Sequence, residues 1–228
     1  MADLAKCSRP AATLLIMLPG AYTAPERFES EGFVAAVRRE RIAADILLVD
    51  AHVGYFENRS IVERLSEDVL QPARAYGYAK IWLVGISNGG AAAILTVERV
   101  PRAAEGIVLL APYLGGRSIA QQIRSKGGLR QWEPAIPFDR GDGDQVMWRW
   151  LKQHAGDADA APRPTVPELY LGYGNSDLYV FNHRTLGAAM PPSHVVDTGG
   201  GHDWPTWRGL WDRILPLLPL ERDATCKG

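Results

Sequence analysis

The chain has 228 residues, a formal net charge of −1 from 25 Lys and Arg against 26 Asp and Glu, and a hydrophobic content of 46%. A chain of this length buries enough apolar surface to fold as one α/β domain without help from a metal. The near-neutral charge, with no long basic run, argues against a nucleic-acid-binding or membrane-surface protein, because both bind through clustered Lys and Arg. We therefore expect a small-molecule partner.

The two cysteines, Cys7 and Cys226, lie near opposite ends of the sequence. No CxxC pair and no Cys/His ligand spacing occurs, so the sequence supports neither a disulfide framework nor a zinc site, and it leaves open whether these two cysteines pair. No apolar stretch approaches the length of about 18 residues that a membrane span requires. From these features we expect a cytoplasmic protein in a reducing compartment.

Apolar runs rich in Val, Ile and Leu recur along the chain, and six of them are predicted to be strands. They cover residues 13–18, 44–50, 80–85, 106–111, 168–172 and 193–197. Their hydrophobicity is continuous rather than alternating, which is typical of strands covered on both faces in a parallel sheet. The first run follows Lys6 and Arg9, as in a signal peptide, but it is short and leads into a Pro19-Gly20 turn, so we interpret it as a buried strand.

Helical periodicity fills most intervals between these runs. A helix is expected after the first strand, around residues 28–37, and another from about 60 to 76, where Ser60 and Glu63 have the spacing of a capping box. Residues 91–99 predict a helix directly after the third strand, and residues 204–215 predict the last one. This alternation predicts an α/β fold with a doubly wound, mainly parallel sheet of about six strands, in one domain covering residues 1–228.

Residues 113–167 interrupt this alternation. They contain Gly-Gly pairs, several prolines and an acidic loop, but no strand-like run. Because they follow the carboxyl end of the fourth strand, we expect a lid- or cap-like insertion over a site at that edge of the sheet. Trp132 and Trp148 are predicted to line a substrate pocket there, or else to pack inside the insertion's own core.

The most informative motif is Gly85-Ile-Ser87-Asn-Gly89, between a predicted strand and a predicted helix. A serine on such a sharp turn needs small residues two positions to either side, because Cβ atoms there would collide, and Gly85 and Gly89 occupy both positions. The turn lifts the Ser87 hydroxyl above the sheet edge and places the Asn88 N–H at a helix N-terminus. We predict that Ser87 is a nucleophile; the alternative is a glycine-rich turn with a capping serine.

A serine hydroxyl needs a base to take its proton. Among the five histidines, His202 follows the last predicted strand and so reaches the same sheet edge as Ser87. His52 also follows a strand; it is the nearest competitor and is otherwise expected to line the pocket. Of the remaining three, His154 lies in the insertion, His183 lies just beyond an acid candidate, and His194 lies in a predicted strand.

The base in turn needs an acid to hold its tautomer. Asp177 follows the fifth strand and gives the chain order Ser, Asp, His, which this kind of sheet uses. Asp197 is a weaker alternative because it lies in or at the end of the strand leading to His202. Asp203 is expected to begin the last helix instead.

Stabilisation of a developing oxyanion needs two N–H donors. The Asn88 N–H is one. The loop after the first strand supplies the other, because Gly20 lets the backbone approach the substrate and the Ala21 N–H then points at the same place. Gly20 and Tyr22 are predicted to line the substrate pocket beside this oxyanion hole.

With Ser87, Asp177 and His202 as triad, almost the whole chain resembles a compact member of the α/β-hydrolase superfamily. The segment Gly-Gly-His202-Asp-Trp204-Pro-Thr-Trp207-Arg is similar to the terminal motif of the esterase D and siderophore-esterase groups, although Pro19 stands where many relatives have histidine before the oxyanion glycine. The resemblance implies a serine carboxylesterase that works through an acyl-enzyme, without a metal or other cofactor.

Three enzymatic alternatives use the same triad: a thioesterase, an acyltransferase or a peptidase. A non-catalytic hydrolase-like binding protein is the alternative from another class. The insertion is too short to build a deep lipid tunnel, so we expect esters of small or medium size as substrates. The sequence does not specify the oligomeric state.

Overall fold

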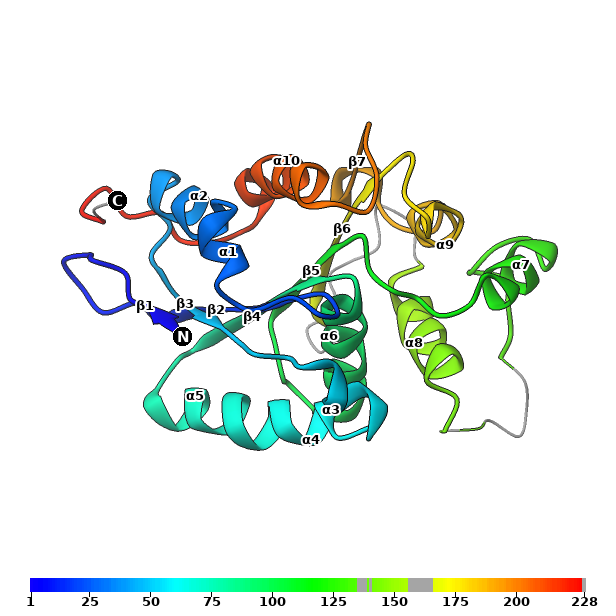
Figure 1. Cartoon of the computed structure of the whole chain (residues 1–228), viewed down its shortest axis with the longest axis horizontal. Coiled ribbons are helices and arrows are strands. Elements are labelled where there is room, and N and C mark those ends of the chain that lie inside the picture. The colour runs from blue at the N-terminus through cyan, green and yellow to red at the C-terminus, as the bar shows by residue number, and fades with distance from the viewer. Residues whose placement is uncertain (135–138, 140, 156–165, 227–228) are drawn as a thin grey trace.

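A seven-stranded sheet lies at the centre of the molecule, with helices packed on both faces (Figure 1). The computed structural model describes residues 1–134, 139, 141–155 and 166–226. In chain order the strands are β1 (Ala2–Asp3), β2 (Thr13–Leu18), β3 (Ala44–Leu48), β4 (Lys80–Ile86), β5 (Gly106–Leu110), β6 (Glu168–Gly174) and β7 (Val195–Thr198). They are arranged in the order β1-β3-β2-β4-β5-β6-β7, and only the β1–β3 pair is antiparallel.

The six strands expected from the sequence all form, with ends shifted by a few residues, and the mainly parallel α/β architecture is confirmed. The run before Pro19 is β2, a strand with every residue buried between β3 and β4, and not a signal-peptide helix. Burial on both faces explains its continuous hydrophobicity. The seventh strand, β1, is too short to leave a hydrophobic pattern in the sequence.

Two hydrophobic layers hold the helices on the sheet. One face is covered by α1 (Arg27–Ser30), α2 (Phe33–Arg39) and α10 (Trp204–Ile214), and the other by α4 (Ile61–Leu65), α5 (Gln71–Tyr76) and α6 (Asn88–Arg99). Shorter pieces are α3 (Val53–Glu57) and the 3₁₀ turns η3 (Pro192–His194) and η4 (Leu215–Leu217). Because helices cover both faces, only the strand ends are free to carry a site.

The helix expected at 60–76 is not one regular helix. Between α4 and α5 the segment Ser66–Leu70 forms a π-helical turn, η1, just before Pro72, which has no N–H to continue regular α-helical bonding. The expected capping box is wrong: the Ser60 side chain does not cap the helix, and its hydroxyl instead donates to Asn58 Oδ1 at 2.6 Å.

The described part of residues 113–167 forms α7 (Arg117–Ser125), α8 (Gly143–Leu151) and the 3₁₀ turn η2 (Lys152–His154). Helix α8 packs on α6, and α7 packs on α9 (Val180–Gly187). Helices α7, α8 and α9 lie at the right of Figure 1, on the side away from the chain termini. Residues 135–138, 140 and 156–165 of the expected insertion lie outside the described residues.

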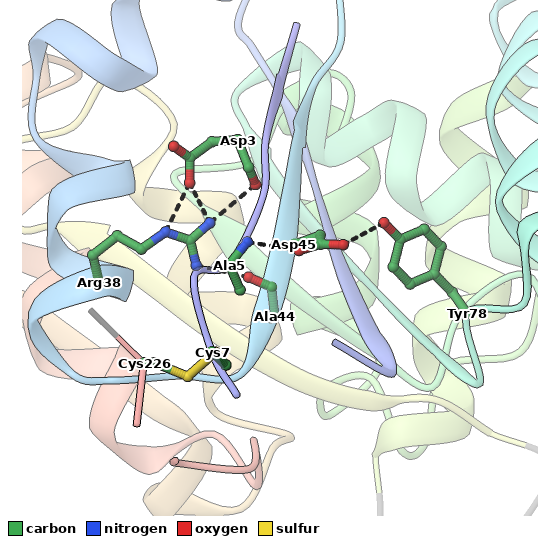
Figure 2. Close-up of polar contacts among 8 residues, drawn as sticks. All are labelled: Asp3, Ala5, Cys7, Arg38, Ala44, Asp45, Tyr78 and Cys226. Atoms are coloured by element: carbon green, nitrogen blue, oxygen red, sulfur yellow. Dashed lines mark hydrogen bonds and ion pairs between the residues drawn. A yellow bond between two sulfur atoms is a disulfide. The ribbon is translucent and has the colours of Figure 1, made fainter. Parts of the chain in front are cut away.

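The two ends of the chain meet at the edge of the sheet that carries β1. Cys7 and Cys226 form a disulfide there (Figure 2). This bond conflicts with the reducing compartment expected from cysteine usage, because structural disulfides are rare there. The sequence did not predict the pairing, because the two cysteines are 219 residues apart and nothing in the sequence shows that the chain ends converge. Backbone bonds from Ala43 to Glu221 and from Asp223 to Arg41 fasten the C-terminal segment beside β3.

Polar side chains fasten the N-terminal segment to the same edge (Figure 2). The Asp3 carboxylate pairs with the Arg38 guanidinium of α2. Asp45 on β3 accepts from the Ala5 amide at 2.7 Å and from the Tyr78 hydroxyl at 2.6 Å.

Within the described ranges, no helix combines the length and apolar character needed to cross a membrane.

Candidate active site

Ser87 lies between β4 and α6, on a sharp turn that requires a positive φ angle at the serine. Its φ of 51° and ψ of −116° are strained for a residue with a side chain. A Cβ at Gly85 would lie 2.4 Å from the Gly89 carbonyl oxygen, and a Cβ at Gly89 would lie 2.0 Å from that of Leu18. Both glycines are therefore required by contact, as the motif predicted, and the turn is the sharp strand-to-helix elbow.

Three side chains from three different loops form one hydrogen-bonded chain. The Ser87 hydroxyl lies 2.9 Å from His202 Nε2, and His202 Nδ1 lies 2.8 Å from Asp177 Oδ2. Because a carboxylate only accepts, Nδ1 carries the ring proton and Nε2 is free to accept from the hydroxyl. Ser87, Asp177 and His202 follow β4, β6 and β7, whose carboxyl ends share one edge of the sheet.

The Asp177 carboxylate is buried and held from two sides. Its second oxygen, Oδ1, accepts from the Tyr179 amide at 2.7 Å, and the side chain has no exposed surface. Burial by itself raises the pKa of Asp177, but the hydrogen bonds from His202 and from the Tyr179 amide outweigh it and hold the pKa below the usual value. The charged carboxylate therefore faces His202, where it stabilises a proton on the ring.

The competing residues have other roles in the structure. His52 is exposed and caps α3, with Nδ1 accepting from the Gly54 amide at 3.1 Å. Asp197 is exposed and accepts from the Asn175 side-chain amide at 2.8 Å. Asp203 caps α10 by accepting from the Thr206 amide at 3.0 Å, as expected. None of these contacts involves Ser87 or His202.

The loops carrying the two expected oxyanion donors flank Ser87. A Cβ on Gly20 would lie 3.4 Å from the Ser87 Cβ, so the loop after β2 runs directly beside the serine. Within the described ranges, neither the Ala21 amide nor the Asn88 amide has a hydrogen-bond partner. An oxyanion requires two N–H donors, so these two amides stay the predicted pair.

The structure brings only part of the expected substrate pocket to this site. Tyr22 follows the loop beside Ser87 and is 88% exposed. Trp132 and Trp148 lie in the hydrophobic core, 2% and 0% exposed, which is the core packing that the sequence left open as the alternative to a pocket wall. The Trp148 indole N–H donates to the Leu114 carbonyl at 2.9 Å, which fixes that ring inside the protein.

Aromatic rings that sequence reasoning did not select enclose the His202 imidazole. Tyr179 and Trp207 pack edge-on against it, with centroids 5.3 and 5.0 Å away. A signal was available for Tyr179, two residues after Asp177, and for Trp207, one helical turn after the cap of α10. Within the described residues, no cluster of three or more His, Cys, Asp or Glu side chains could hold a metal ion.

No protein-family model and no curated protein sequence matches this chain. Among solved structures, S-formylglutathione hydrolase FrmB from Staphylococcus aureus aligns with a TM-score of 0.60 at 12% identity, over 91% of this chain and 81% of that one. The chain has the α/β-hydrolase fold. Est1E from Butyrivibrio proteoclasticus (TM-score 0.57, 15% identity, 95% and 92% covered) and carboxylesterase CesB from Bacillus subtilis (0.52, 14%, 94% and 86%) are also similar.

Proposed function

We propose that the protein is a serine hydrolase that cleaves carboxylic esters through a covalent acyl-enzyme. The observation that carries this proposal is the continuous hydrogen-bonded chain from Ser87 through His202 to Asp177 at the carboxyl edge of the sheet. The esterase and hydrolase names of the structural neighbours support the same class.

In the proposed mechanism, His202 Nε2 takes the Ser87 proton as the serine oxygen attacks the ester carbonyl carbon. The Ala21 and Asn88 amides donate to the oxyanion that forms, and Asp177 stabilises the positive charge on His202. His202 then gives its proton to the alcohol oxygen, which leaves. A water molecule, deprotonated by His202, attacks the acyl carbon; the bond from that carbon to Ser87 Oγ then breaks, His202 returns the proton to Ser87 Oγ, and the acid leaves. No step needs a cofactor or a metal.

The size of the insertion bears on the acyl and alcohol groups of the substrate. We propose esters of small or medium size, because the described insertion helices α7 and α8 are short and the rings of Trp132 and Trp148 are already packed. The segment 113–167 would act as a small lid within one domain. A thioesterase, acyltransferase or peptidase would use the same three residues, so parallel assays with a thioester, with an added alcohol acceptor and with a peptide amide separate these activities from ester hydrolysis.

The alternative from another class is a hydrolase-like binding protein without activity. Such a protein has no need of a serine oriented toward a histidine that is oriented by a buried carboxylate. We propose no nucleic-acid or membrane partner, on the near-neutral charge alone.

The test combines labelling with turnover. A fluorophosphonate should modify Ser87 alone, and p-nitrophenyl esters from acetate to palmitate should be cleaved fastest at the short end. Ser87→Ala should abolish both while leaving the melting temperature nearly unchanged. Modification of a different serine, or full turnover by Ser87→Ala, would refute the proposed function; faster cleavage of palmitate than of acetate would refute the size preference.

The cytoplasmic location expected from the sequence stays a prediction, and the Cys7–Cys226 disulfide weighs against it, because structural disulfides are rare in reducing compartments. Alkylating free thiols in intact cells before extraction decides the matter. Alkylated Cys7 and Cys226 would support the cytoplasm, and a protected pair would support an oxidising compartment.

A further inference from the structure

Behind the acid of the proposed triad lies a second histidine that this mechanism does not use. His183 is on α9, and its polar side chain is completely buried. Its Nε2 atom lies 2.8 Å from the Pro112 carbonyl oxygen. Because a carbonyl oxygen only accepts, Nε2 must carry a proton and donate it. A neutral His183 is therefore restricted to one tautomer.

The other ring nitrogen of His183 faces the acid. Nδ1 has no hydrogen-bond partner in the described part of the chain and lies 4.0 Å from Asp177 Oδ1. Burial is the main cause that lowers the pKa of His183; the bond to Pro112 and the charge of Asp177 oppose it, and His202 adds to it. A neutral ring leaves the negative charge of Asp177 to His202, whereas a Lys or Arg at this place would neutralise it.

The bond to Pro112 reaches the backbone that supports the nucleophile. The next residue, Tyr113, donates its amide proton to the Ser87 carbonyl at 2.9 Å. A Cβ at Gly90, in the first turn after Ser87, would lie 2.7 Å from the Pro112 Cβ, so this segment packs tightly under the elbow. His183 therefore connects the helix that follows the acid to the turn that carries the serine.

The remaining neighbours of His183 belong to the same assembly. The rings of Tyr173 on β6 and Tyr179 pack against it, with centroids 5.6 and 6.5 Å away. Tyr179 also contacts the ring of Tyr113, at 5.5 Å, and the ring of His202. The titratable groups around His183 are thus Asp177, His202 and these tyrosines, with no Lys or Arg among the contacts described.

We propose that His183 is a positioning residue of the catalytic triad, which holds the Asp177 loop and the Ser87 elbow in register by donating Nε2–H to the Pro112 carbonyl. The inference rests on the proposed function, since it gives Asp177 the role of the acid. His183 touches neither substrate nor the transferred proton; it acts through the backbone on one side and through the carboxylate on the other.

Two substitutions separate the hydrogen bond from the volume of the ring. Gln can place an amide N–H near the position of Nε2 and does not titrate, whereas Met fills similar space without a donor. We expect His183→Met to lower kcat for p-nitrophenyl acetate and the rate of fluorophosphonate labelling by about 10- to 100-fold with little change in KM, because small displacements of catalytic groups cost this much. His183→Gln should restore both rates to within about threefold.

The pH profile of kcat/KM provides a readout that a merely structural role would not move. Its acidic limb reports the base of the free enzyme. Displacement of Asp177 in His183→Met stabilises the His202 imidazolium less, so the limb should shift to lower pH, and His183→Gln should keep it in place. The matched control is His194→Met, which removes a similar bond, from Nδ1 to the Leu169 carbonyl at 3.1 Å, at the amino end of β6; it should lower only the melting temperature.

The outcomes distinguish this inference from the proposed function. Ser87→Ala and Asp177→Asn are measured alongside, and wild-type turnover in either would refute the triad itself. If both lose turnover while His183→Met keeps normal rates and a normal pH profile, only the role of His183 is refuted. If His183→Met does not fold, His183→Gln decides: retained turnover with an unshifted limb supports the donor role, and lost turnover in folded protein overturns it.

Discussion

Asp177 divides its two oxygens between His202 Nδ1 and the Tyr179 amide, while Asp197 is exposed and bonds Asn175. Asp177→Asn should therefore lower kcat by about 10⁴-fold, because an amide neither stabilises the imidazolium nor enforces the tautomer. Ester turnover measures the loss, and circular dichroism checks the fold. Asp197→Asn is the matched control and should keep nearly full activity; a large defect there instead would move the acid role to Asp197.

The sequence was sufficient to select candidate residues that follow strands, and insufficient to select residues whose role depends on packing in the folded chain. Ser87, Asp177 and His202 could be selected because each follows a parallel strand, and parallel strands end at one edge. His52 also follows a parallel strand, so this criterion did not separate it from His202; the structure does, because His52 caps α3. His183 could not be recognised, because its partners are a backbone carbonyl and a carboxylate that only the folded chain brings near it.

The elbow between β4 and α6 shows how one element depends on another. Gly89→Ala would place a Cβ 2.0 Å from the Leu18 carbonyl oxygen at the end of β2, next to the loop that carries Ala21. The backbone must shift, which should cost about 1–3 kcal/mol of stability and most of the activity. Denaturant unfolding and acetate-ester turnover measure the two effects.

Gly209 in α10 is the matched control, because it is exposed and a Cβ there meets nothing within 4 Å. Gly209→Ala should stabilise the protein by about 0.5–1 kcal/mol, since alanine loses less backbone entropy in a helix than glycine. Equal effects of the two substitutions would show that close contact at the elbow is not the cause.

Periodicity predicted elements better than it predicted the contacts at their ends. The strands formed where apolar runs were continuous, but the Ser60 cap did not form: the Ser60 hydroxyl donates to Asn58 Oδ1 and accepts from no helix amide. The position of Trp148 in the insertion predicted that its indole lies near the site. In the structure its N–H instead donates to the Leu114 carbonyl inside the core. Hydrophobic patterns do not encode such competition among polar groups.

At the scale of the whole molecule, two tyrosine hydroxyls should make the free energy of unfolding fall at alkaline pH. Burial, the charge of Glu168 and a hydrogen bond to it raise the pKa of Tyr170 from 10.0 to about 12, and burial with the Asp45 bond raises the pKa of Tyr78 further. The unfolded chain then loses these protons first, so stability present below pH 10 should fall as the pH rises above it. Urea unfolding across this range should be less pH-dependent in Tyr170→Phe; an identical slope would contradict the assignment.

The Cys7–Cys226 disulfide joins the chain ends beside the amino end of β3, whereas Ser87 follows the carboxyl end of β4. A link across 219 residues restricts the unfolded chain strongly, and the Cys7→Ser/Cys226→Ser double variant should lose about 2–4 kcal/mol. Its fold should persist, because backbone bonds beside β3 still hold the C-terminal segment. Ester turnover at 25 °C should therefore remain normal while the melting temperature falls. Dithiothreitol should lower the melting temperature of the wild type to that of the variant and leave the variant unchanged. Equal melting temperatures of oxidised wild type and variant would show that the bond adds no stability.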